Sequence, residues 1–300
     1  MNFRNASAFL VAFACSVSAS AETRTISAII DTAQENPAPV GASDSAGGFA
    51  FLQFDDNSNE LSWDIAWQDL TGAPTGMHIH GPAPVGSNAG VVVNLGNIGG
   101  LTSPSSGSTT LTGDVASYLL DGQTYVNIHT ASNGPGEIRG QIKPTNINLT
   151  ATLDTAQEIP APTGVPAGAG GSAHVAYDPD TNTLGWMIEW DDLSGPATGM
   201  HFHGPAGFGE TAGVQVNVGN ISGLSSPSIG STQISDELAS ELTNGQWYLN
   251  IHTAANGPGE IRGQLVPEPQ SAILLGLVLL PLPCRTSRLK SADNGTQDGN

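Results

Sequence analysis

An internal repeat constrains this chain more than any other feature of its sequence. The segment Asp31-Thr32-Ala33-Gln34-Glu35 returns as Asp154-Thr155-Ala156-Gln157-Glu158, which is a shift of 123 residues. The same shift relates His129 to His252, so no insertion separates these anchors. A unit of this length exceeds solenoid repeats, which run to roughly 20–50 residues. The chain is therefore predicted to contain two copies of a whole domain.

Each copy has the pattern of an all-β domain. Leu61, Trp63, Ile65 and Trp67 alternate with polar or small residues, as expected of a strand with one face in a core. Glycine and proline punctuate the remaining short segments. Further strands are predicted at 24–30, 47–54, 90–95, 107–112, 124–130 and 136–142, with one short helix at 114–120 and its equivalent at 236–242. We therefore expect an all-β fold of two tandem Greek-key-like β-sandwiches, spanning residues 22–144 and 145–266, each with one short helix.

Charge and cysteine content exclude some classes of protein. The formal net charge of −19 argues against nucleic acid as a partner, because affinity for phosphate requires lysine and arginine. An acidic surface suits a secreted protein. Cys15 and Cys284 both lie in terminal segments, so the folded domains are expected to lack a disulfide.

Residues 1–21 have the three parts of a secretory signal peptide. Arg4 supplies the positive charge, 6–17 is a short apolar run, and Ala19-Ser20-Ala21 is a small-x-small cleavage site. The apolar run is too short to span a bilayer. The mature protein is therefore predicted to be secreted, without a stable membrane span.

The C-terminal segment 267–300 differs in kind from the repeats. Val266-Pro267-Glu268-Pro269 precedes an apolar run at 272–282 and a basic cluster at 285–290. This order resembles the PEP-CTERM sorting signal. The resemblance implies processing by an exosortase-type enzyme and delivery to the cell surface or extracellular matrix of a Gram-negative-type bacterium.

Six of the seven histidines form two equivalent sets, which are His78, His80 and His129 in the first copy and His201, His203 and His252 in the second. Residues i and i+2 of a strand share one face, so each His-x-His pair projects from one side, with the third histidine on a later strand. Imidazole suits zinc, copper, iron and nickel. The sets are candidate metal sites, with copper or zinc as the cofactor. The alternative is that these histidines hydrogen-bond to loop carbonyls and hold the glycine-proline loops in place.

Alternation also predicts which side chains accompany the histidines. Val126 and Ile128 should face the core, so Asn127 and His129 face away from it. By the same reasoning Glu137, Arg139 and Gln141 face away, opposite Ile138 and Ile142. If the strands are adjacent, these side chains form one polar cluster in each domain.

The repeat unit resembles the CHRD domain, named from chordin. The resemblance is carried by Ala33-Gln34-Glu35-x-Pro-x-Pro, the Met-His-x-His-Gly-Pro-Ala segment that begins at Met77, the strand 125–130 and the closing segment 136–142. It covers both copies and implies an extracellular binding or structural module rather than a known enzyme activity. A matrix polysaccharide or a protein is the expected partner.

A weaker similarity is to copper/zinc superoxide dismutase, which also has Gly-x-His-x-His on a β-sandwich strand and a later strand histidine. That similarity implies an alternative function as a copper-dependent oxidoreductase. Arg139 and Arg262 would then take the place of the arginine near the copper. This chain departs from that family because it has no bridging histidine, no zinc-site group and no disulfide.

Overall fold

A computed structural model describes residues 23–268 of the chain. The predicted signal peptide at 1–21 lies outside the described residues, as does the predicted sorting tail beyond Glu268. The described part consists of two domains built in the same way.

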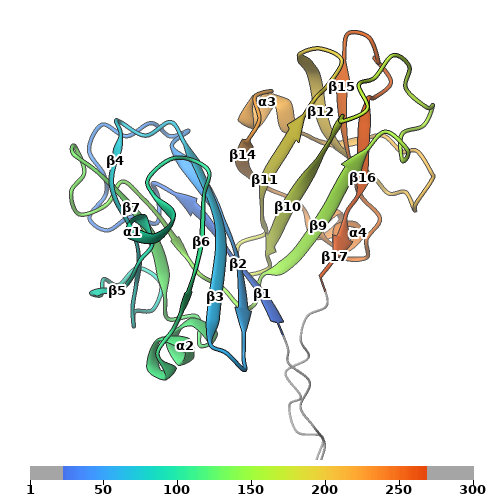
Figure 1. Ribbon diagram of the computed structural model, residues 1–300. Coiled ribbons are helices and arrows are strands. Elements are labelled where there is room, and N and C mark those ends of the chain that lie inside the picture. Colours follow the sequence, from blue (N-terminus) through green and yellow to red (C-terminus); the bar gives the residue numbers. More distant parts are fainter. Residues whose placement is uncertain (1–22, 269–300) are drawn as a thin grey trace, which may run out of the picture. The chain divides into compact units, whose positions relative to one another are not determined.

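The first domain is a single antiparallel sheet that curls around its own core (Figure 1). Its strands are β1 (Thr23–Asp31), β2 (Gly47–Asp55), β3 (Glu60–Gln68), β4 (Pro74–His80), β5 (Val91–Asn94), β6 (Ser105–Thr110), β7 (Tyr125–Thr130) and β8 (Ile138–Gln141). They lie in the order β5-β4-β7-β8-β1-β2-β3-β6. Several neighbouring strands are therefore not consecutive in sequence and are joined by crossover connections. One of these crossings places β4 beside β7.

The second domain repeats this order strand for strand, as β13-β12-β15-β16-β9-β10-β11-β14. A short additional strand pairs with β9. The strands are β9 (Ile147–Asp154), β10 (Gly170–Asp178), β11 (Thr183–Asp191), β12 (Ala197–His203), β13 (Val214–Asn217), β14 (Ser228–Gln233), β15 (Tyr248–Thr253), β16 (Ile261–Gln264) and β17 (Val266–Pro267). The predicted all-β fold of two tandem domains is confirmed.

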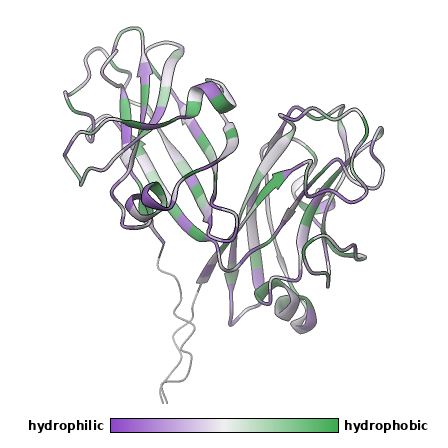
Figure 2. Ribbon diagram, turned by 180° about the vertical axis from the view of Figure 1, so that it is seen from behind, coloured by the Kyte–Doolittle hydropathy of each residue, from purple (hydrophilic) through white to green (hydrophobic). Residues whose placement is uncertain are grey.

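The core of each domain follows from the alternation of apolar and polar residues along the strands (Figure 2). In β3, Leu61, Trp63 and Ile65 are at most 2% exposed, as the sequence pattern predicts. In β7, Val126 and Ile128 belong to the same core cluster. Their neighbours on that strand must therefore lie on the other face of the sheet.

The predicted helices are present as α2 (Gly113–Leu120) and α4 (Asp236–Thr243). Ser235 caps α4, because its side chain accepts a hydrogen bond from the backbone N–H of Leu238. Each domain also has a second short helix, α1 (Gly96–Gly99) and α3 (Val218–Ser222), so one helix in each copy was missed. A single helical turn is too short to show a helical period in the sequence.

Candidate metal centre

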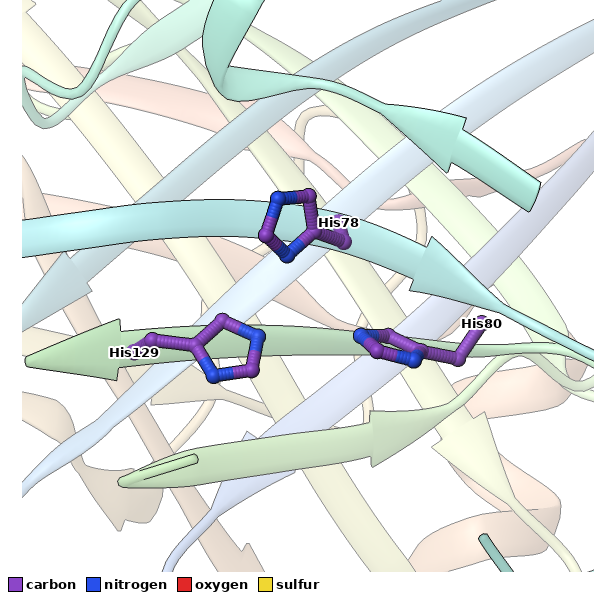
Figure 3. A group of neighbouring side chains, drawn as sticks. All are labelled: His78, His80 and His129. Carbon is purple, nitrogen blue, oxygen red and sulfur yellow. The ribbon is translucent and has the colours of Figure 1, made fainter. Parts of the chain in front are cut away.

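The first histidine set comes together on two neighbouring strands. His78 and His80 lie on β4 and His129 lies on β7, which pairs with β4 in an antiparallel register. Met77 and Ile79 fill the core on the opposite face, at 0% and 1% exposure. Figure 3 shows the three imidazoles facing a common space above these strands. One ring nitrogen from each histidine lies within 4.8 Å of the others, which is a spacing that one metal ion can bridge.

The second domain brings together the equivalent set. His201 and His203 lie on β12 and His252 lies on β15, and their ring nitrogens also lie within 4.8 Å of one another. Here Nδ1 of His201 lies 3.0 Å from Nε2 of His252, so two of the imidazoles share a hydrogen bond. All six predicted residues are thus grouped as the spacing indicates, whereas His174, on β10, belongs to neither cluster.

Backbone carbonyls orient two imidazoles of each set. In the first domain, Nδ1 of His80 lies 3.0 Å from the carbonyl oxygen of Ala89, and Nδ1 of His129 lies 2.9 Å from that of Gly134. A carbonyl only accepts, so both Nδ1 atoms carry the proton and both Nε2 atoms keep a free lone pair. These Nε2 atoms and Nδ1 of His78 are buried and have no hydrogen-bond partner among the described residues. His80 and His129 therefore contact the loops through Nδ1, and each of the three rings keeps one buried nitrogen that makes no hydrogen bond within residues 23–268.

The surroundings of the first histidine set favour the neutral form of its imidazoles. Burial lowers the pKa of His78, and its neighbours His129 and His80 lower it further. Burial also lowers the pKa of His80 and of His129, although the carbonyl that each contacts acts in the opposite direction. In the second domain burial and the adjacent histidines lower the pKa of His201 to about 4. A neutral imidazole is the form that binds a metal ion.

Arg139 approaches the histidine set through Tyr125, which lies between it and His80. Its guanidinium carbon lies 3.5 Å from the centre of the Tyr125 ring, and that ring stacks on His80 with the centroids 5.0 Å apart. The order β4-β7-β8 places Tyr125 between the histidine and the arginine. Arg139 is 1% exposed and donates to Asn88 and to the carbonyl of Ser87. It holds the loop over this face, and Arg262 stacks on Tyr248 in the same way.

Glu137 does not join the polar cluster predicted from strand alternation. The carboxylate is fully buried and accepts hydrogen bonds from Thr71, Thr130 and Asn133. Burial alone would raise the pKa of Glu137, but these hydrogen bonds lower it below its usual value. The residue ties three segments together and is a structural carboxylate.

The sequence reasoning missed Glu35 as part of this face. Nδ2 of Asn127 lies 3.3 Å from Oε1 of Glu35, and the glutamate is 6% exposed. Burial raises the pKa of Glu35 above its usual value. The sequence does single out Glu35, because it belongs to a segment that recurs at the shift of 123 residues, with Glu158 as its equivalent. Nothing in the spacing shows that this segment reaches β7.

Comparison with known proteins assigns both repeats to one domain family. The family model described as the CHRD domain matches residues 26–142 and 149–265. The chain therefore belongs to the CHRD domain family, as a tandem CHRD protein. The tandem CHRD domains support an extracellular-type binding module. Among residues 23–268, no helix has the length and apolar character needed to cross a membrane.

A curated relative is similar to part of the chain. Chordin of Danio rerio is 33% identical over 162 residues, which covers 49% of this chain and 17% of the relative. The chain thus matches a small part of that protein's length. No solved structure matches the chain significantly.

Proposed function

We propose that this protein is an extracellular tandem CHRD module in which each domain binds one copper or zinc ion through its three histidines. The observation that carries this proposal is the convergence of one donor nitrogen from each of three imidazoles, within 4.8 Å, in both domains. The hydrogen bonds to the loop carbonyls use only Nδ1 of His80 and of His129, so they do not by themselves require three imidazoles to converge.

The donor set selects the class of metal. Each cluster consists of imidazoles alone, without a carboxylate or a thiolate among its grouped residues. Calcium and magnesium prefer oxygen ligands, whereas imidazole nitrogen suits copper and zinc. The carbonyls of Ala89 and Gly134 would orient His80 and His129 as hydrogen-bond partners often orient metal ligands.

We further propose that the module acts outside the cell, with residues 1–21 as its export signal and 267–300 as a surface-sorting signal read by an exosortase-type enzyme. The net charge of −19 suits a soluble extracellular surface. A matrix polysaccharide or an extracellular protein is the proposed partner of the folded domains.

Elemental analysis of the chain, purified without a polyhistidine tag and dialysed against copper and zinc, tests the metal sites. We expect about two equivalents per chain, because there are two clusters. His78→Ala together with His80→Ala should leave one equivalent and an intact core, since both side chains lie on the face opposite Met77 and Ile79. His174→Ala is the matched control, and it should retain both equivalents.

Failure to retain metal at micromolar concentration would contradict the proposal. The histidines would then serve only to hold the loops. Loss of folding in the double variant without any change in metal content would lead to the same conclusion.

The copper-dependent oxidoreductase remains the second candidate function. It is favoured by the partial exposure of the His78 and His129 rings, although the ring nitrogens without a hydrogen-bond partner within the described residues are themselves buried. Superoxide turnover by the copper-loaded chain, compared with the double variant, tests it. Turnover equal to that of free copper in buffer would leave the binding module as the function.

A further inference from the structure

Position 76 lies beside two of the three imidazoles. Gly76 is directly opposite His129 in the register of β4 and β7, and it precedes His78 by two residues on the same strand face. The register shifts between Pro74 and Gly76, immediately before this position. Gly199 has the same place beside His252 and His201 in the second domain.

A side chain at position 76 would occupy space that the histidines use. A Cβ atom on Gly76 would lie 2.8 Å from Cε1 of His78 and 3.5 Å from Cδ2 of His129. The first distance is shorter than van der Waals contact allows, so the imidazole of His78 would have to turn away. On Gly199 the equivalent distances are 3.1 Å to His201 and 3.3 Å to His252, which is tight but less severe.

The backbone does not explain glycine at these positions. Neither Gly76 nor Gly199 is among the residues with positive φ. Glycine inside a strand costs about 0.5–1 kcal/mol relative to alanine, and it often marks a place where other groups approach closely. The groups that approach here are the imidazole rings.

We propose that Gly76 and Gly199 are positioning residues of the two metal sites, whose missing side chains allow the imidazoles to converge. This inference rests on the proposed function. Its consequence is that a methyl group at position 76 weakens metal binding although all three ligands are still present.

The test uses the full chain with His201→Ala and His203→Ala, so that only the first site remains. Gly76→Ala in this background should weaken copper binding roughly 10–100-fold, the range seen when partners that orient metal ligands are removed. The Cu(II) electron paramagnetic resonance spectrum should change, while the melting temperature of the metal-free protein stays within a few degrees. A purely structural role would change the melting temperature and leave the spectrum of the bound copper unchanged.

Gly72→Ala is the matched control, because a Cβ atom there would meet nothing within 4 Å. It should bind copper as the parent does. Gly199→Ala, made with His78→Ala and His80→Ala so that only the second site remains, should cause a smaller loss of copper affinity than Gly76→Ala. If Gly76→Ala fails to fold, the Gly199→Ala variant tests the inference instead.

Unchanged copper affinity and an unchanged spectrum in Gly76→Ala would overturn the inference while leaving the proposed function in place. Absence of copper from the parent chain would overturn both. An equal loss in Gly72→Ala would also overturn the inference, because the effect would then not depend on contact with the imidazoles.

Discussion

The two CHRD domains keep the same carbonyl and stacking contacts around their histidines, but they pack different side chains in the core behind them. The carbonyl contacts of His80 and His129 measure 3.0 and 2.9 Å, and those of the equivalent His203 and His252 measure the same. In both domains an arginine lies 3.5 Å above the ring of a tyrosine that stacks on a histidine.

The other face of the same strands differs between the domains. Ile79 of the first domain corresponds to Phe202, and Thr124, just before β7, corresponds to Trp247. The indole of Trp247 is fully buried, packs against Phe202 and donates to Glu241 of α4. The first domain has no equivalent of this cluster.

The histidine face and the core can therefore vary independently. Successive side chains of a strand point to opposite faces, so a larger core residue need not displace a histidine beside it in the sequence. Five predictions test the comparison between the two domains, in order of decreasing size.

Trp247→Thr, which introduces the residue of the first domain, should destabilise the second domain by about 3–5 kcal/mol, as expected for loss of a large buried aromatic. Amide hydrogen exchange in β15, compared with β7, measures the effect in each domain. Phe208→Ser is the control, because Phe208 is 76% exposed and its loss should change stability by no more than about 0.5 kcal/mol. A loss in β7 as large as that in β15 would show that the cores are not independent.

Glu137→Gln and its equivalent Glu260→Gln should each cost on the order of 2–3 kcal/mol, because hydrogen bonds to a buried charge are lost. The two domains should respond alike, since Ser194 donates to Glu260 as Thr71 does to Glu137. Urea unfolding monitored by hydrogen exchange in β8 and β16 measures both. Unequal losses of stability would show that Glu137 and Glu260 do not have the same role in the two domains.

The same carboxylates predict an acid dependence. The folded-state pKa of each lies below the ordinary value of 4.5, so their contribution to stability is complete above about pH 4.5 and is lost as the pH falls through the folded-state pKa. The double variant Glu137→Gln, Glu260→Gln should therefore lose less stability than the natural chain between pH 5 and pH 3, which denaturation at each pH tests.

Thr124→Val should stabilise the first domain by about 1 kcal/mol. Thr124 is fully buried and its Oγ1 has no hydrogen-bond partner among residues 23–268, so the hydroxyl contributes only a desolvation cost. Hydrogen exchange in β7 measures the gain, with β15 as the internal control. A loss of stability would contradict this prediction, because it would show that the Thr124 hydroxyl makes a stabilising hydrogen bond.

Thr211→Asn should stabilise the second domain by about 0.5 kcal/mol, because it supplies the partner that Asn88 provides in the first. Asn88 accepts a hydrogen bond from Nη1 of Arg139 at 3.0 Å, whereas Nη1 of Arg262 is buried without a partner in the described part of the chain. Asn88→Thr should lower the stability of the first domain by a similar amount. Thermal unfolding of both variants measures these two changes in stability. Changes of the same sign in Thr211→Asn and Asn88→Thr would contradict the prediction.

Much of the fold could be predicted from the sequence, because the information was local or repeated. Alternation in β3 identified its buried face, and the constant shift of 123 residues identified two equivalent domains. Alternation also placed His78 and His80 on the face opposite Ile79. The single-turn helices α1 and α3 were missed, since one turn leaves no periodic pattern.

The candidate site depended more strongly on long-range contacts. The sequence is enough to predict that His78 and His80 share a face, because that follows from the geometry of one strand. The pairing of β7 with β4, which adds His129 to the set, and the contact of Glu35 with Asn127 are visible only in the folded domain. Strand pairing joins residues far apart in the chain, and it depends on how the whole sheet buries its apolar face rather than on any local pattern. The same strand order decided that Arg139 stacks on Tyr125, the ring that in turn stacks on His80.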